Sequence, residues 1–135
     1  MRKGRNTKMT EIRCIIAGGR DFTNYNALKK ALASVNFGDN TLTVISGTAR
    51  GADSLGERYA KENNLKLMRF PAQWDKYGKR AGYLRNEEMC RHCDTVICFW
   101  DGKSRGTMHM INIAKQNHKP LAVFNYDGNL REWQK

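Results

Sequence analysis

The chain has 135 residues, of which 40% are apolar and 27% are charged, so it can form one domain with a hydrophobic core but not two. The 24 lysines and arginines outnumber the 13 acidic residues and give a net charge of +11, which favours a phosphate-rich partner such as a nucleotide or a nucleic acid. No apolar run is long enough to span a bilayer, and the N-terminus lacks the apolar core of a signal peptide. We therefore expect a cytoplasmic protein without a membrane partner.

Part of the positive charge lies at the N-terminus. The segment "MRKGRNTK" carries four basic residues and no acidic one. We predict that residues 1–10 form a disordered basic arm and that residues 11–135 form the domain. A solvated basic surface explains the excess charge about as well as a nucleic-acid-binding surface does.

From residue 11 onward, short β-branched runs alternate with segments of helical period. The connections are too long for hairpins, so the strands are expected to be parallel. Thr23 or Asn24 is suited to cap the first helix. The sequence thus predicts an α/β fold, a single doubly wound domain of about five parallel strands with helices on both faces. The expected strands are 12–18, 42–46, 65–71, 95–100 and, as the last strand, 120–125, and the expected helices are 24–35, 49–63, 81–93 and 106–117.

The segment 71–80, "PAQWDKYGKR", is the one long irregular connection in this pattern. Aromatic and basic residues in a loop over a ligand cleft are typical of a lid, which makes Trp74, Tyr77 and Lys79 the candidate lid residues. A surface loop held by Trp74 is the alternative.

The four cysteines do not indicate a metal or redox centre. Cys14 and Cys98 lie in apolar runs and are expected in the core. Cys90 and Cys93 form a C-x-x-C motif, but the chain has no second pair with metal-ligand spacing. This motif also closes a predicted helix, whereas a thioredoxin-type motif opens one. We therefore predict no metal site.

Glycine-rich turns follow three of the predicted strands, where parallel sheets bind ligands. These turns are "GGRDFT" (18–23), "SGTARGAD" (46–53) and "WDGKSRGT" (100–107), and each brings an arginine, while "GYLRNEE" (82–88) adds Arg85. A glycine turn that leads into a helix exposes backbone N–H groups suited to a phosphate. We expect Arg20, Arg50, Arg85 and Arg105 to line one cleft with Gly19, Gly47 and Gly106. The candidate ligand-binding residues are Gly18, Gly19, Arg20, Asp21, Ser46, Gly47, Thr48, Arg50, Gly51, Asp53, Arg85, Asn86, Glu87, Asp101, Gly102, Ser104, Arg105, Gly106 and Thr107.

Several of these side chains have simpler explanations. Asp53 could cap its helix or accept a hydrogen bond from a ribose hydroxyl. Asp101 could also accept a hydrogen bond from a ribose hydroxyl, or it could pair with Arg105. His109 has no triad partner at readable spacing and is expected to be structural. Trp74 and Tyr77 could stack on a base or simply pack.

The segments "IIAGGRDF", "SGTARGAD", "YAKENNLKLMRFPAQWDKYGKRAG", "LRNEEM" and "FWDGKSRGT" together resemble the YspA-related branch of the SLOG superfamily over residues 11–124. The resemblance implies a Rossmann-like domain that binds a nucleotide or a nucleotide-derived molecule and needs no other cofactor. It also implies a homo-oligomer, since SLOG proteins commonly dimerise.

Two groups of SLOG relatives imply different functions. "SGTARGAD" and Arg85-Asn86 are similar to two motifs of DprA, "SGxAxGID" and "RNR", which implies single-stranded DNA binding. The cytokinin-activating phosphoribohydrolases carry "PGGxGTxxE", and aligning its "GT" with Gly106-Thr107 places the catalytic glutamate at Met110, which cannot transfer a proton. Arg85 could match the catalytic arginine of these enzymes, with Glu87 or Glu88 as a substitute carboxylate.

The sequence therefore favours binding of a nucleotide-type ligand, as a sensor, carrier or sequestering module, without evident catalysis. A phosphoribohydrolase-like or N-glycosidase-like enzyme and a single-stranded nucleic-acid-binding module are the alternatives. Glu87 and Glu88 have a simpler role than catalysis, because acidic residues stabilise the first turn of a helix.

Overall fold

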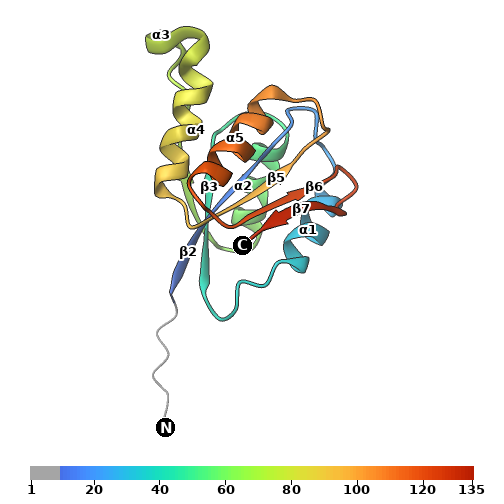
Figure 1. The fold of residues 1–135 in the computed structure, drawn as a ribbon. Helices are drawn as coiled ribbons and strands as arrows, with labels where there is room; N and C mark the ends of the chain where they lie inside the picture. The colour runs from blue at the N-terminus through green and yellow to red at the C-terminus, as the bar shows by residue number, and fades with distance from the viewer. Residues whose placement is uncertain (1–9) are drawn as a thin grey trace.

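A computed structural model describes residues 10–135, and the expected N-terminal arm therefore falls almost wholly outside the described residues. Figure 1 shows strands and helices alternating along the chain. Asn24 caps the first helix, because its side chain accepts a hydrogen bond from Ala27 N at 3.0 Å. The elements are β2 (Glu11–Gly18), α1 (Tyr25–Ser34), β3 (Thr41–Ser46), α2 (Ala52–Glu62), β4 (Lys66–Arg69), α3 (Trp74–Tyr77), a 3₁₀ helix (Gly78–Arg80), α4 (Ala81–His92), β5 (Thr95–Phe99), α5 (Arg105–Gln116), β6 (Leu121–Phe124) and β7 (Leu130–Gln134).

The strands form one sheet in the order β4-β3-β2-β5-β6-β7. The first five strands in this order are parallel, which confirms the predicted doubly wound fold, and β7 pairs antiparallel with β6. From β2 the chain first builds outward through β3 to β4 and then returns to add β5 and β6 on the other side. The direction of winding therefore changes between β2 and β5, and parallel sheets bind ligands beside such a switch point.

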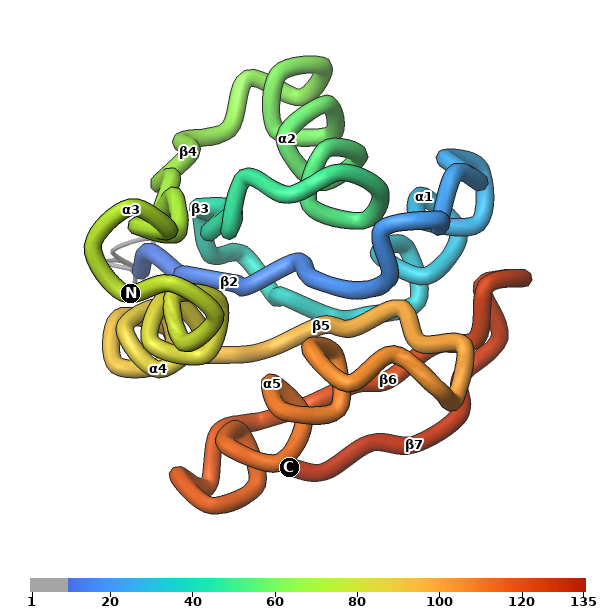
Figure 2. Tube along the Cα trace, turned by 90° about the horizontal axis from the view of Figure 1, so that it is seen from above, coloured from blue at the N-terminus to red at the C-terminus, as the bar shows by residue number. Residues whose placement is uncertain are grey.

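Helices cover both faces of the sheet. Seen from above, α1 and α2 lie on one side of the strands, and α4 and α5 lie on the other (Figure 2). Neighbouring residues of β2 face opposite layers: Ile16 packs in the core with Leu28 of α1, and Ile15 packs in the core with Met89 of α4 and Met110 of α5. This two-sided burial explains why the strand sequences are continuous apolar runs.

Two expectations about connections were wrong. Residues 71–80 are not a wholly irregular loop, because α3 and the 3₁₀ helix occupy residues 74–80 and lead directly into α4. Figure 1 shows α3 at the far end of α4, beyond the edge of the sheet. The strand ending near residue 125 is also not the last one, because a turn with Gly128 at φ +87° sends the chain back as β7.

Candidate functional site

A cavity of about 370 Å³ opens at the carboxyl ends of the strands, beside the switch point between β2 and β5. The loops after β2, β3 and β5 contribute to it, together with α4, so the three glycine turns of the sequence do meet in space. We call this hollow the first cavity. Its lining residues are Ala17, Gly18, Gly19, Arg20, Asp21, Ala49, Asp53, Arg85, Asn86, Met89, Ser104, Gly106, Thr107 and Met110.

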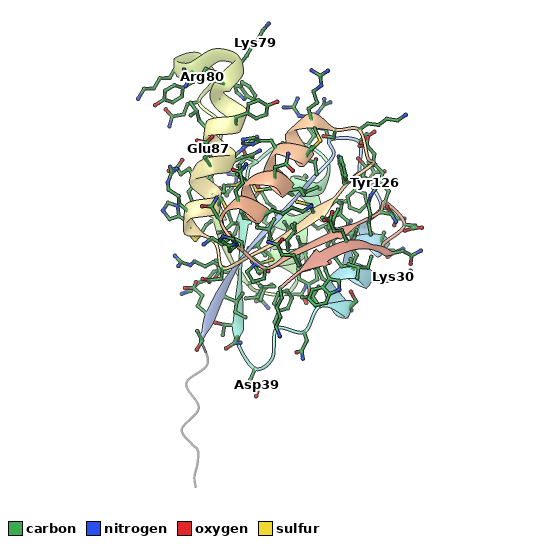
Figure 3. All side chains as sticks on the ribbon, in the orientation of Figure 1. Lys30, Asp39, Lys79, Arg80, Glu87 and Tyr126 are labelled. Carbon is green, nitrogen blue, oxygen red and sulfur yellow. The ribbon has the colours of Figure 1, made fainter. Side chains whose placement is uncertain are left out.

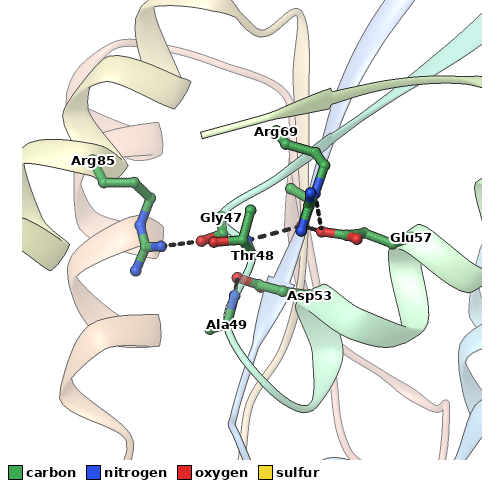
Figure 4. Close-up of polar contacts among 8 residues, drawn as sticks. Gly47, Thr48, Ala49, Asp53, Glu57, Arg69 and Arg85 are labelled. Carbon is green, nitrogen blue, oxygen red and sulfur yellow. Dashed lines mark hydrogen bonds and ion pairs between the residues drawn. The ribbon is translucent and has the colours of Figure 1, made fainter. Parts of the chain in front are cut away.

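Arg85 connects α4 to the turn after β3 (Figure 4). Its Nη1 donates a hydrogen bond to the carbonyl oxygen of Gly47, and its Nε donates to Oδ1 of Asn86 at 3.1 Å. Partial burial lowers the pKa of the guanidinium, which nevertheless keeps its charge because an arginine pKa starts so high. A side chain at Gly47 would displace Arg85, since a Cβ there would lie 2.8 Å from Nη1. Two of the five N–H groups of Arg85 thus fix its position, and the others remain for a ligand.

Asp53 is a buried carboxyl group in the wall of the first cavity. Only 5% of its surface is exposed, and burial raises its pKa to about 6 despite the opposing effect of Arg85. Its Oδ2 accepts a hydrogen bond from Ala49 N at 3.1 Å, and within residues 10–135 its Oδ1 has no hydrogen-bond partner. Asp53 does not cap its helix, because the N-cap residue of α2 is Gly51. One carboxyl oxygen therefore remains available to accept a hydrogen bond from a ligand.

The N-terminus of α5 forms another wall of the first cavity. Ser104 caps this helix, its Oγ accepting a hydrogen bond from Thr107 N at 3.5 Å. Asp101 holds the preceding turn by accepting hydrogen bonds from the N–H groups of Lys103 and Ser104, both at 2.8 Å, and these bonds lower its pKa. Apart from the chain neighbours and the backbone of α5 itself, a Cβ at Gly106 would have no protein atom within 4 Å. This helix end therefore presents open space and N–H groups to the first cavity.

The loops after β2 and β3 are tied together by their backbones. Ala52 N donates to Gly19 O at 3.2 Å, and Phe22 N donates to the same carbonyl at 3.2 Å. Gly51 has φ +77°, and a Cβ there would lie 2.6 Å from the carbonyl carbon of Arg20. Gly51 therefore supports the site through close backbone packing and does not line the first cavity.

A second cavity, of about 380 Å³, adjoins the first and shares Arg20, Ala49 and Arg85 with it. Arg50 and Trp74 lie in its wall, so three of the four expected arginines gather in two adjoining cavities. The fourth, Arg105, is exposed at the start of α5 and lines neither cavity, so the expectation of one cleft with all four arginines was wrong. The remaining residues of the second cavity are Gly47, Thr48, Pro71 and Ala72.

Ser46 stabilises the turn after β3 through hydrogen bonds of its side chain. It is fully buried, donates a hydrogen bond from Oγ to Glu57 Oε2 at 2.6 Å and accepts one from Thr48 N at 3.0 Å. Thr48 adopts a left-handed φ of +66°, which is unusual for a β-branched residue. The turn is thus strained at Thr48 and held by Ser46, a combination that is common in ligand sites.

The other candidates lie outside the two cavities. Glu87 and Glu88 line a third hollow beside α4, which shares Arg85 with both cavities, and neither glutamate lines the first cavity. Because α4 begins at Ala81, they also lie beyond its first turn, so the expectation that they stabilise that turn was wrong. Gly102 has φ +83° and packs near Arg131. Among the candidate lid residues, only Trp74 borders the second cavity, while Lys79 points away from the body of the molecule (Figure 3).

Two side chains outside the list of candidate binding residues support the site. Tyr126, from the turn between β6 and β7, donates a hydrogen bond to Asp21 Oδ1 at 2.6 Å, and its hydroxyl fills the space where Gly19 would carry a Cβ. His109 places Nδ1 3.2 Å from the amide nitrogen of Asn86, and burial lowers its pKa. Sequence reasoning missed Tyr126, because it lies in a segment that was not expected to return to the sheet. His109 was expected to be structural, and its contact with Asn86 fits that expectation.

The four cysteine side chains are buried. Burial raises the pKa of Cys14, Cys90 and Cys98, and raises that of Cys93 to about 12. The four thiols are free. Among residues 10–135, no three histidine, cysteine, aspartate or glutamate side chains lie together in a way that could hold a metal ion. The helices of the same region are all too short or too polar to cross a bilayer.

The strand order defines a Rossmann-like, doubly wound α/β domain, and the first cavity lies at its switch point. Residues 12–77 match the model of the YspA, cpYpsA-related SLOG family. The chain is 34% identical over 119 residues to the Gene 61 protein of Mycobacterium phage D29, an alignment that covers 83% of this chain and 95% of the phage protein. The chain belongs to the YspA, cpYpsA-related SLOG family, as its motifs predicted.

The fold is similar to that of DNA processing protein A (DprA) from Streptococcus pneumoniae, with a TM-score of 0.65 at 18% identity. The similarity covers 86% of this chain and 50% of DprA, so this chain spans about half the length of that protein. At this level of identity the comparison establishes the fold.

Proposed function

We propose that the first cavity binds a nucleotide or a nucleotide-derived, phosphate-bearing ligand, and that the protein acts as a sensor, carrier or sequestering module. The observation that carries this proposal is the convergence of Arg85, the N-terminus of α5 and buried Asp53 on one cavity at the switch point. Its volume of about 370 Å³ lies within the range of small-molecule sites.

The chemistry of the walls suits the parts of a nucleotide. Arg20, Arg85 and the free N–H groups at the start of α5 supply positive charge and donors for a phosphate. The unpartnered oxygen of Asp53 suits a ribose hydroxyl, which is a donor. Met89 and Met110 supply an apolar wall against which a sugar or base can pack.

Catalysis is not part of this proposal. Met110 lies in the wall of the first cavity, at the position where the phosphoribohydrolase motif would place its glutamate, and a thioether cannot transfer a proton. Glu87 and Glu88 line a different hollow. We expect no release of free base from nucleoside monophosphates above background, and adenine release that is lost in Glu87→Gln or Glu88→Gln would contradict this expectation.

The test is calorimetric titration of the protein with adenine and guanine nucleotides, combined with native mass spectrometry for a co-purified ligand. Arg85→Ala should abolish binding, but it also removes the contact with Gly47. Gly106→Ala is the sharper variant, because Gly106 lines the first cavity and the added methyl group would have no protein atom beyond its own helix turn and chain neighbours within 4 Å. Arg58→Ala is the matched control, since Arg58 stacks on Tyr25 and lies outside both cavities. Unchanged binding in Gly106→Ala would refute the site.

A second candidate function, binding of single-stranded nucleic acid, is favoured by the net charge of +11. Contacts with many backbone phosphates make affinity fall steeply with salt, whereas a small ligand in a pocket is less sensitive. Deleting residues 1–8 should weaken oligonucleotide binding and leave nucleotide binding intact, and Arg85→Ala should do the reverse. Tight DNA binding at moderate salt that survives the deletion and is lost in Arg85→Ala would favour nucleic acid over the small ligand.

A further inference from the structure

The two adjoining cavities differ in charge. The first is lined by two arginines and two aspartates, Arg20 and Arg85 against Asp21 and Asp53. The second is lined by three arginines and no acidic residue. Positive charge is therefore concentrated in the second cavity and at its junction with the first, where Arg20 and Arg85 are shared. An anionic group is most favourable at that junction, because both arginines can reach it.

The second cavity also has an aromatic wall that the first one lacks. Trp74 is 49% exposed, and Pro71 and Ala72 lie beside it. The far edge of the indole packs toward α4, 3.4 Å from the Cβ position of Gly82. One part of the ring is thus fixed against the protein while much of its surface stays open, and an exposed indole beside arginines is suited to stack on a nucleobase.

We propose that the two cavities bind a single ligand made of two nucleoside units joined through phosphate, that is, a dinucleotide. One unit lies in the first cavity, the linking phosphate lies between Arg20 and Arg85, and the base of the second unit stacks on Trp74. This inference rests on the proposed nucleotide-binding function and specifies its ligand class.

A mononucleotide would fill only one of the two cavities and leave one set of contacts unused. The pair of cavities also differs from an open nucleic-acid groove, because sequence-tolerant single-strand binders present several aromatic rings in succession. The lining of the two cavities includes one aromatic side chain, Trp74. Affinity should therefore rise from one nucleotide to two and then level off.

The experiment compares AMP and GMP with the 5′-phosphorylated dinucleotides pApA and pGpG, the pyrophosphate-linked AppA, and the hexanucleotide pA6. The wild-type protein should bind at least one dinucleotide tenfold or more tightly than the matching mononucleotide, and pA6 no more tightly than pApA. Comparing pApA with AppA shows whether the link is a phosphodiester or a pyrophosphate.

Three variants assign the effect to the second cavity. Trp74→Ala should remove the preference for the dinucleotide and leave mononucleotide affinity within about twofold. Trp133→Ala is the control, because this indole is 63% exposed on β7 and lies in neither cavity. Gly106→Ala should weaken both ligand classes. Dinucleotide binding should also quench tryptophan fluorescence in wild type and in Trp133→Ala, and quench it much less in Trp74→Ala.

The failures are distinguishable. Equal affinity for mono- and dinucleotides, or a dinucleotide preference that survives in Trp74→Ala, would refute binding of a second nucleoside unit in the second cavity. The proposed function would not be affected. Affinity that keeps rising from pApA to pA6 would refute a dinucleotide as the ligand and favour a groove that binds nucleic acid. If none of the probes binds, the proposed function fails together with the inference. Circular dichroism on each variant confirms that a lost signal reflects binding and not folding.

Discussion

Replacing Asp53 by asparagine should raise the stability of the folded protein at neutral pH and lower its affinity for the proposed nucleotide ligand. The buried carboxyl has a pKa of about 6, against an ordinary value of 3.8. Since each factor of ten in proton affinity corresponds to about 1.4 kcal/mol, keeping this group ionised in the folded state costs about 3 kcal/mol above pH 6. Asparagine keeps an acceptor for Ala49 N and carries no charge, so Asp53→Asn removes most of that cost.

The sign of the pH dependence follows from the raised pKa. Below pH 3.8 the side chain is neutral in both the folded and unfolded states, and the aspartate carries no penalty. As the pH rises toward 6, the unfolded chain loses this proton before the folded one does, so the wild-type protein loses stability through this window. The advantage of Asp53→Asn should therefore be about 3 kcal/mol at pH 7.5 and about 0.6 kcal/mol at pH 4.

Urea unfolding at pH 4 and pH 7.5, followed by circular dichroism, measures both values. Asp39→Asn is the matched control, because Asp39 is exposed at the tip of the loop between α1 and β3 (Figure 3). Its effect should be near zero at both pH values. A stability gain for Asp53→Asn that is equal at the two pH values, or absent at pH 7.5, would refute the reasoning. Weaker nucleotide binding by the stabilised variant would assign the carboxylate to the ligand.

Other substitutions test the backbone and the supporting contacts. Gly51→Ala should lower the free energy of unfolding by about 3 kcal/mol or more, because the methyl group would overlap the backbone at Gly19 and Arg20, and urea titration checks this. Gly106→Ala should raise it by up to about 1 kcal/mol, since alanine favours a helix more than glycine does; a loss of stability in the same titration would show that the space is not open. Tyr126→Phe should cost about 1 kcal/mol in thermal unfolding through the lost hydrogen bond to Asp21, and no change would mean that water replaces it. Cys93 should resist iodoacetamide at pH 8 in the native protein and react once it is unfolded, as peptide mass spectrometry can show.

The parts of the fold that the sequence could predict are those with strong local patterns. The buried strands read as continuous apolar runs, and Asn24 marked the start of α1. The return of β7 was missed because its residues, "LREWQ", are mostly polar and half-exposed, so the apolar run of a buried parallel strand is absent. The turn "YDGN" before it is the signal that could have indicated a hairpin.

The meeting of the three glycine turns at one cavity was predictable, because parallel strands carry the turns that follow them to one edge of the sheet. Which side chains enter which cavity was not predictable, because that depends on rotation about the helix axes. Arg85 and Glu87 are two positions apart on α4, yet Arg85 borders the first cavity and Glu87 does not. Arg105 likewise lines neither cavity, although its neighbours Ser104 and Gly106 line the first one.

The hydrogen bond from Ala52 N to Gly19 O, with the tight contact at Gly51, joins the loops after β2 and β3 before any ligand arrives. The entropy of ordering these loops is therefore lost when the protein folds and not when it binds, which leaves more of the interaction energy for affinity. Under the proposed function, ligand choice would rest on side chains around these loops, such as Arg50, Asp53 and Trp74. Exchanging these side chains would then change the preferred ligand without changing the backbone that holds the loops together.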